Sequence, residues 1–68
     1  MDVKNRLEAN WKQLRGAVKE QWGELSDDDL DRIDGQRDQL VGKLQERYAL
    51  AREDAEREVK RFETNGRY

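Results

Sequence analysis

The sequence predicts an all-α fold, a small four-helix bundle made of two helical hairpins. Apolar residues recur at intervals of three and four positions along most of the chain, which is the period of amphipathic helices. The 68 residues include no proline and only five glycines, so few positions interrupt a helix. A serine followed by three aspartates at residues 26–29 is typical of a helix start. These observations predict one helical domain spanning residues 1–68.

The first predicted helix runs from residue 3 or 4 to about Gly23. Its apolar residues are spaced by three and four positions and share one narrow face. They are Leu7, Trp11, Leu14, Val18, Trp22 and Leu25. Gly23 directly follows the second tryptophan and is expected to end the helix within a turn. Because this helix carries little net positive charge, its two tryptophans are predicted to lie in the core and not at a membrane surface.

A short second helix is predicted over residues 27–34. Ser26 is expected to cap its first turn, and Asp29, three residues later, completes a near capping box. A serine cap stabilises a helix by about 1 kcal/mol. Gly35 is placed to end this helix in the left-handed conformation, which glycine adopts without steric cost.

Two further helices are predicted over residues 36–48 and 53–63, separated by a break at residues 49–52. The break is placed by comparison with the first half of the chain, because the alanine-rich segment there itself favours a helix. Residues 64–66 are expected to stop the last helix. The predicted core combines apolar positions from all four helices: Trp11, Leu14, Val18, Trp22, Leu30, Ile33, Leu40, Leu44, Tyr48, Val59 and Phe62.

The two halves of the chain also resemble each other, which predicts an approximate internal duplication. Residues 13–22 match residues 39–48 at glutamine, leucine, glycine, glutamate and aromatic positions. Repeats of this kind usually reflect duplicated structural units, here two helical hairpins. The match aligns Gly16 with Gly42, and both lie on the far side of their helices from the apolar face. Three interpretations of these glycines stay open: a tolerated weak spot or slight kink, close packing against another helix, or a contact face between molecules.

The composition excludes several classes of function. Charged residues make up 44% of the chain, and the net charge is −2. The chain has no cysteine, so it has no disulfide framework, thiol chemistry or cysteine-based metal site. No apolar run approaches the roughly 18 residues of a membrane span, and residues 1–10 lack the apolar core of a signal peptide. We therefore expect a cytoplasmic protein with no cofactor.

The second predicted helix carries five aspartates, the strongest cluster of potential catalytic or metal-binding groups. Acidic residues are favoured at a helix start in any case, and the only serine, Ser26, has no histidine in the chain to activate it. Asp27, Asp29 and Asp31 have the opening spacing of a calcium loop, but Arg32 stands where that loop requires glycine. The cluster therefore predicts a helix start and neither a catalytic nor a metal site.

Three segments resemble the CsbD-like family of small bacterial general stress proteins. They are NWKQLRGAVKEQWGELSDDDL at residues 10–30, GQRDQLVGKLQERY at residues 35–48 and AEREV at residues 55–59. The resemblance extends over about residues 5–62 and departs at residue 49, an alanine where glycine is common, and at Leu14-Arg15, where Phe-Lys is frequent. It implies two hairpins packed crosswise, similar to SAM-like domains, and expression under general stress. It implies no catalytic or cofactor-binding residues, because no activity is established for the family.

Basic residues on the first and third predicted helices form the candidate interaction face. They are Lys12, Arg15, Lys19, Lys43 and Arg47, with Arg37 as a further member. If they share one surface, that surface would suit a nucleic-acid backbone, whose binding depends on concentrated positive charge. The net acidic charge of the chain favours an ordinary solvated face instead.

We therefore predict a non-enzymatic stress-response protein that acts by association with other macromolecules. A protein partner or weak self-association is compatible with so small a core, whereas a membrane is not expected as a partner. The alternative is a nucleic-acid-binding domain that uses the basic residues of the first and third helices. A third interpretation is an abundant, highly charged protectant with no specific partner.

Overall fold

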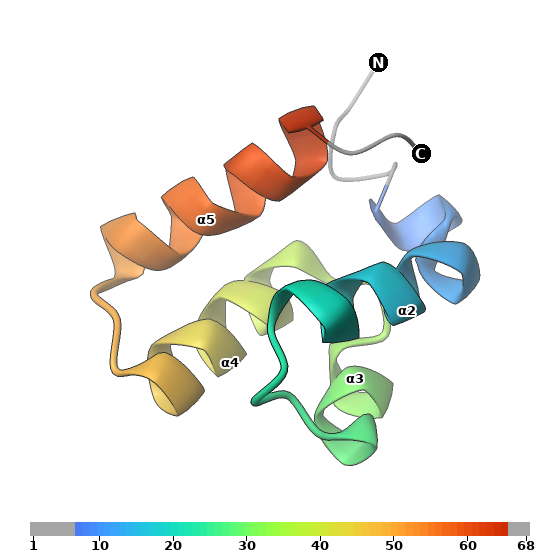
Figure 1. Ribbon diagram of the computed structural model, residues 1–68, viewed down its shortest axis with the longest axis horizontal. Helices are drawn as coiled ribbons and strands as arrows, with labels where there is room; N and C mark the ends of the chain where they lie inside the picture. The colour runs from blue at the N-terminus through green and yellow to red at the C-terminus, as the bar shows by residue number, and fades with distance from the viewer. Residues whose placement is uncertain (1–6, 66–68) are drawn as a thin grey trace.

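The computed structural model describes residues 7–65, and this part of the chain has the predicted all-α fold with no strand. Helical residues 7–9 precede four longer helices: α2 (Trp11–Gln21), α3 (Asp27–Ile33), α4 (Arg37–Tyr48) and α5 (Arg52–Asn65) (Figure 1). The predicted start of the first helix at residue 3 or 4 lies outside the described residues, as does Gly66, the last residue of the predicted stop at residues 64–66.

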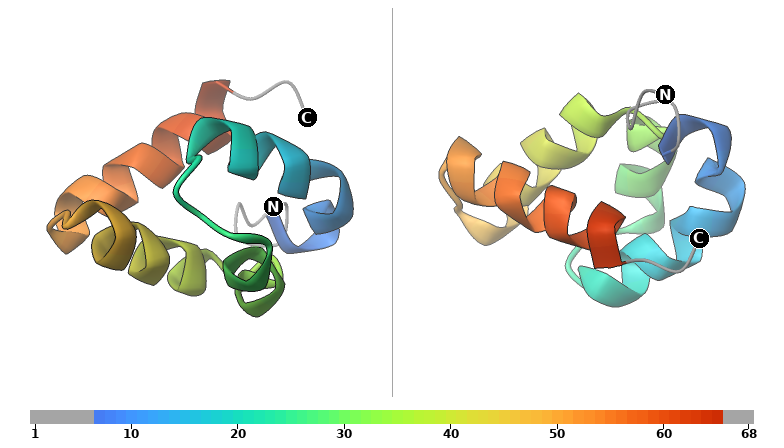
Figure 2. Two further views of the ribbon diagram at one scale, coloured as in Figure 1. Left: turned by 60° about the horizontal axis from the view of Figure 1, so that its bottom comes forward. Right: turned by 90° about the horizontal axis from the view of Figure 1, so that it is seen from above.

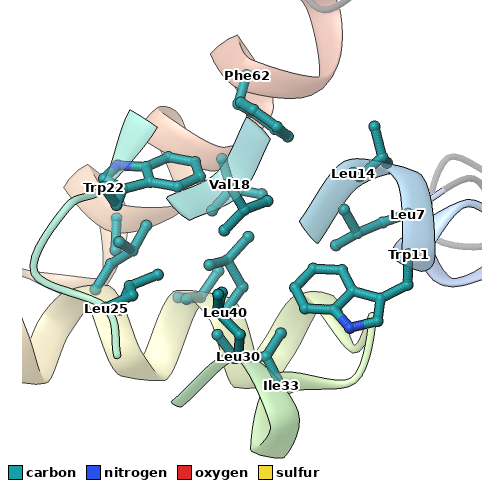
Figure 3. Close-up of a cluster of buried hydrophobic side chains, with 14 residues drawn as sticks. Leu7, Trp11, Leu14, Val18, Trp22, Leu25, Leu30, Ile33, Leu40 and Phe62 are labelled. Carbon is teal, nitrogen blue, oxygen red and sulfur yellow. The ribbon is translucent and has the colours of Figure 1, made fainter. Parts of the chain in front are cut away.

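The helices enclose one core. α4 and α5 run in opposite directions and pack side by side, and α3 packs against α4 (Figures 1 and 2). Apolar side chains of α2 meet those of α3 and α4 in the middle of the molecule, where Val18 faces Leu40 (Figure 3). Each helix therefore contributes one apolar face to a shared centre, which is how a short chain removes a large part of its apolar surface from water.

Every predicted core residue except Tyr48 is buried, and Tyr48 is half-buried against the same cluster. The core also contains four further apolar residues, two of which, Leu7 and Leu25, belong to the predicted apolar face of the first helix: Leu7, Leu25, Val41 and Ala55. The rings of Trp22 and Phe62 stack in a tilted arrangement with their centroids 5.1 Å apart, which joins the end of α2 to α5. The 3.6-residue period of the apolar positions thus identified most of the core.

The first predicted helix is not continuous, which corrects the prediction of one helix up to Gly23. Residue 10 is a turn with φ −110° and ψ 19°, and α2 ends at Gln21. The carbonyl oxygen of Asn10 accepts hydrogen bonds from the backbone amides of residues 13 and 14 at 3.0 and 2.8 Å, so helix α2 starts afresh there. The turn brings the backbone of Glu8 against Gly35, where a Cβ would lie 2.9 Å from the Cα of Glu8. The spacing of apolar residues could not predict this contact, because it joins segments that are far apart in the chain.

Both ends of α3 follow the predicted local chemistry, although the helix ends at Ile33, one residue earlier than predicted. The Ser26 hydroxyl accepts a hydrogen bond from the Asp29 amide at 3.1 Å, and the Asp29 carboxylate accepts one from the Ser26 amide at 3.1 Å. The predicted capping box is therefore confirmed. At the other end, Asp34 has φ 46° and Gly35 has φ 81°, so two consecutive residues adopt the left-handed conformation.

The predicted break between the last two helices is confirmed at residues 49–51. Ala49 ends α4 with φ 55°, a left-handed conformation that costs alanine about 1–2 kcal/mol and glycine almost nothing. Helix α5 extends to Asn65 and so runs past the predicted end at residue 63.

Close packing of other helices at Gly16 and Gly42 is the one interpretation of these glycines that the structure contradicts. Both residues are exposed, and a Cβ added to either would have no neighbouring heavy atom within 4 Å. The apolar faces of α2 and α4 point to the core, so the opposite sides that carry the glycines point to solvent.

Candidate interaction surfaces

The acidic helix α3 lies between the basic sides of α2 and α4. Arg15 forms an ion pair with Asp31, and the Lys19 ammonium lies 2.7 Å from the Asp27 carboxylate. The two cations are one turn apart on α2, and the two aspartates are one turn apart on α3 in the reverse order. Both pairs are largely open to solvent, where single ion pairs contribute little to stability. The hydrogen bond from Lys19 lowers the pKa of Asp27 below its usual value.

On the other side of α3, Asp29 is the one buried charged residue of the described chain, with 3% of its surface exposed. The Arg47 guanidinium donates two hydrogen bonds to its carboxylate, each at 3.0 Å, and the Lys43 ammonium lies 3.6 Å away. The hydrogen bonds from Arg47 and from the Ser26 amide hold the pKa of Asp29 well below its usual range. The same carboxylate raises the pKa of Arg47.

We call α3 with its surrounding cations the paired corner: residues 27–34 together with Arg15, Lys19, Lys43 and Arg47. Four of the five basic residues predicted as an interaction face belong to it, and each faces a carboxylate of α3. The fifth, Lys12, is exposed and makes no ion pair with any residue in the range 7–65. Arg37 lies elsewhere, 3.3 Å from the Glu63 carboxylate on α5. The structure thus brings the predicted residues together around an acidic helix, and a phosphate group there would compete with carboxylates already in place.

The aspartates of α3 diverge, even though their sequence spacing matches the start of a calcium loop. Asp29 points towards α4, whereas Asp27 and Asp31 point towards α2. Within the described residues, no three acidic, histidine or cysteine side chains form a group that could hold a metal ion. The hydroxyl of Ser26 is occupied as an acceptor in the helix cap.

A second charged surface, which the sequence reasoning missed, is the outer face of α5. The side chains of Arg57, Lys60, Arg61 and Thr64 border a shallow open groove there. Glu53 and Asp54 are exposed one turn before them on the same helix. The signal was present in the sequence, because these positions recur every three or four residues opposite the buried face of α5.

The fold and its surfaces define a class: a small all-helical domain with an acidic helix held between basic ones. A family model described as CsbD-like matches residues 5–57. The chain is 55% identical over 65 residues to the UPF0337 protein ECA0631 of Pectobacterium atrosepticum and equally to the UPF0337 protein YjbJ of Escherichia coli; the alignments cover 96% of this chain and 94% of each relative. It is 57% identical over 58 residues to the UPF0337 protein NE2439 of Nitrosomonas europaea, covering 85% of this chain and 62% of that protein.

The chain therefore belongs to the CsbD-like family, as its sequence blocks predicted. No specific activity comes with this membership, since the relatives carry only the designation UPF0337. Among the helices of residues 7–65, none is long and apolar enough to cross a bilayer.

Proposed function

We propose that this protein is a non-enzymatic bacterial general stress response protein that acts by association with other macromolecules. The main support for this proposal is that the side chains best suited to chemistry, Ser26 and Asp29, stabilise the fold instead. The only serine and the buried carboxylate of Asp29 bind each other's backbone amides, and Arg47 closes the carboxylate from the other side. What the described residues offer to the outside is charged surface, which is suited to binding.

In the alternative function, a nucleic acid would bind the predicted basic residues. In the paired corner, these residues are already paired with the carboxylates of α3. Phosphates would have to displace the carboxylates of Asp27 and Asp31 from Lys19 and Arg15, which lowers the net gain of each contact. With partners counted within residues 7–65, Lys12 is the one predicted residue that could bind a phosphate without such an exchange. The geometry therefore favours a protein partner over a nucleic acid.

An experiment that separates these functions is an amide NMR spectrum of the labelled protein in a concentrated extract of stressed bacteria. We expect selective broadening of amides on one surface that disappears after protease treatment of the extract and survives nuclease treatment. Broadening removed by nuclease, or shifts at Lys12, Arg15 and Lys19 on adding short duplex DNA or RNA at low salt, would favour the alternative. Uniformly sharp spectra in the extract would contradict any association.

We also propose that the two halves of the chain are duplicated helical hairpins packed crosswise. Four pairs of positions related by the repeat offset support this proposal, because all eight side chains face the core: Leu14 with Leu40, Val18 with Leu44, Trp22 with Tyr48, and Ile33 with Val59. A chain made of residues 1–34 alone tests it. Reassembly with a separate chain of residues 35–68 into a helical complex, measured by circular dichroism, is the expected result, and two unstructured fragments would contradict it.

A further inference from the structure

Among residues 7–65, no other segment covers the outer face of α5 between residues 53 and 64. The inner face of this helix is fully buried through Ala55, Val59 and Phe62. None of the other described helices covers the opposite side, as the views in Figure 1 and from above in Figure 2 show. The exposed side chains of this face are charged apart from Thr64, so it is unsuited to inserting into a membrane and suited to a charged partner.

Charge on this outer face is divided along the helix axis. Glu53 and Asp54 occupy the first turn, and Arg57, Lys60 and Arg61 follow, all exposed. At 1.5 Å per residue the acidic pair and the Lys60–Arg61 pair are about 10 Å apart. The face is therefore acidic at one end and basic at the other.

The cations on the outer face of α5 differ from those of the paired corner in forming few ion pairs within residues 7–65. Arg57 lies 2.9 Å from Asp54 on its own helix. Lys60 and Arg61 have no acidic partner within residues 7–65. Their charge is available to a partner without displacing a carboxylate, unlike that of Arg15 or Lys19.

From this arrangement we propose that the outer face of α5 binds the same face of a second copy of the chain, with the two helices antiparallel. In that orientation Glu53 and Asp54 of each copy meet Lys60 and Arg61 of the other, so the contact is self-complementary about a two-fold axis. A parallel arrangement would place like charges together. Arg57 lies near the axis, so the two copies of this arginine approach each other there, and each shares Asp54 with the cations of the other copy, which weakens the contact.

A second copy fits this face better than a polyanion does. Glu53 and Asp54 would repel a phosphate backbone that runs along α5, and the net charge of −2 opposes such binding further. The acidic residues that disfavour a nucleic acid are the ones that an antiparallel copy needs. The dimer forms whether or not the protein also binds another macromolecule.

The interface is small and polar, so the dimer is weak. Exposed ion pairs contribute little each and association itself costs free energy, so we expect a dissociation constant of about 1 mM or weaker, and salt screens the contact strongly. We expect amide shifts and a rise in the sedimentation coefficient as the protein is concentrated from about 0.05 to 2 mM at about 20 mM salt. The shifts should be confined to residues 52–65 and should disappear at about 300 mM salt.

Charge exchange gives the decisive test. Lys60→Glu with Arg61→Glu, and separately Glu53→Lys with Asp54→Lys, should each abolish self-association. A mixture of the two variants should associate again, because every repulsion in one is matched by the opposite charge in the other. The matched control is Lys12→Glu with Arg32→Glu, which changes the net charge equally by replacing two exposed cations away from α5.

Several outcomes would overturn the proposal. The first is that amide shifts and sedimentation coefficient do not depend on protein concentration at low salt. The second is that the control variant loses association equally. The third is that a mixture of the two variants, each shown to be folded by circular dichroism, does not associate. A response of the α5 amides to duplex DNA and not to protein concentration would assign the face to a polyanion instead. If a charge-exchanged variant fails to fold, the amide shifts of the wild-type protein on dilution, together with Lys60→Gln and Arg61→Gln, decide the question.

Discussion

The paired corner and the outer face of α5 contain the same kinds of residue and use them in opposite ways. In the corner, Asp29 is removed from water and surrounded by two cations and a backbone amide. On the outer face of α5, the charges remain in solvent: Arg57 pairs with Asp54 on its own helix, and Lys60 and Arg61 make no ion pair within residues 7–65. Burial decides the difference, because a buried carboxylate that loses its partners keeps its desolvation cost while an exposed one exchanges them for water. The corner is therefore expected to govern stability and the α5 face to govern contacts.

The sharpest way to break this comparison is to replace Asp29 by alanine. The change leaves the Ser26 amide, Arg47 and Lys43 without their carboxylate, so we expect the midpoint of thermal unfolding to fall by about 10–15 °C. Asp28→Ala, an exposed position on the same turn, is the control and should shift the midpoint by no more than about 2 °C. Equal effects of the two substitutions, measured by circular dichroism, would remove the distinction between the corner and an ordinary surface.

Gly35 tests the packing beside the corner. Gly35→Ala places a methyl group 2.9 Å from the Cα of Glu8 at φ 81°, so we expect a loss of about 2 kcal/mol in the free energy of unfolding. Gly16→Ala is its counterpart on the open side of α2 and should stabilise the protein by about 0.5–1 kcal/mol, because the methyl group meets nothing. Urea unfolding curves measure both, and a destabilised Gly16→Ala would contradict the open environment of that residue.

Acid should weaken the corner selectively. The pKa of Asp29 is lowered in the folded state, so the unfolded chain takes up the proton more readily and stability falls as the pH drops. The contribution is complete above the usual value of 3.8 and declines below it. We expect the difference in unfolding midpoint between the wild type and Asp29→Asn to stay constant from about pH 7 to 5 and to shrink progressively as the pH falls below 3.8. A difference that does not change with pH would show that the ionised carboxylate is not what stabilises the corner.

Replacing Ala49, which has a left-handed φ, by glycine should stabilise the protein. Its φ of 55° is relieved by Ala49→Gly, and after allowing for the greater freedom of glycine in the unfolded chain we expect about 0.5 kcal/mol of stabilisation. Ala51→Gly, in the same connection but without a left-handed φ, should not stabilise the protein. The free energy of unfolding in urea distinguishes the two.

The smallest effect is expected on α5. Arg57→Ala removes an exposed ion pair with Asp54 and should change the free energy of unfolding by no more than about 0.5 kcal/mol. The same replacement at Arg47 should cost clearly more, because it leaves the buried carboxylate of Asp29 without its main partner. Similar losses at the two arginines in thermal unfolding would show that α5 contributes to stability as the corner does.

The sequence predicted the residues of the candidate surface better than their role. Lys19, Lys43 and Arg47 were identified as basic residues on the predicted helices, and Asp29 as part of a cap. That these groups bind one another follows from contacts between positions that are 8 to 18 residues apart in the chain. The sequence reasoning missed the outer face of α5 because residues 53–68 carry four basic and five acidic groups, and their net charge of −1 does not show how they are ordered along the helix.

The features that the sequence determined by itself depend on residues close together in the chain. They are the helical period of the apolar residues, the Ser26 cap, the break after Tyr48 and most of the core. These features depend on residues within one or two turns of each other, so local rules are enough. Only the tertiary structure decided the turn at Asn10, the burial of Asp29 and the open surroundings of Gly16. Each of these depends on which distant segment packs beside a residue, and solvent exposure, which sets the strength of every charge interaction, is known only once the helices are assembled.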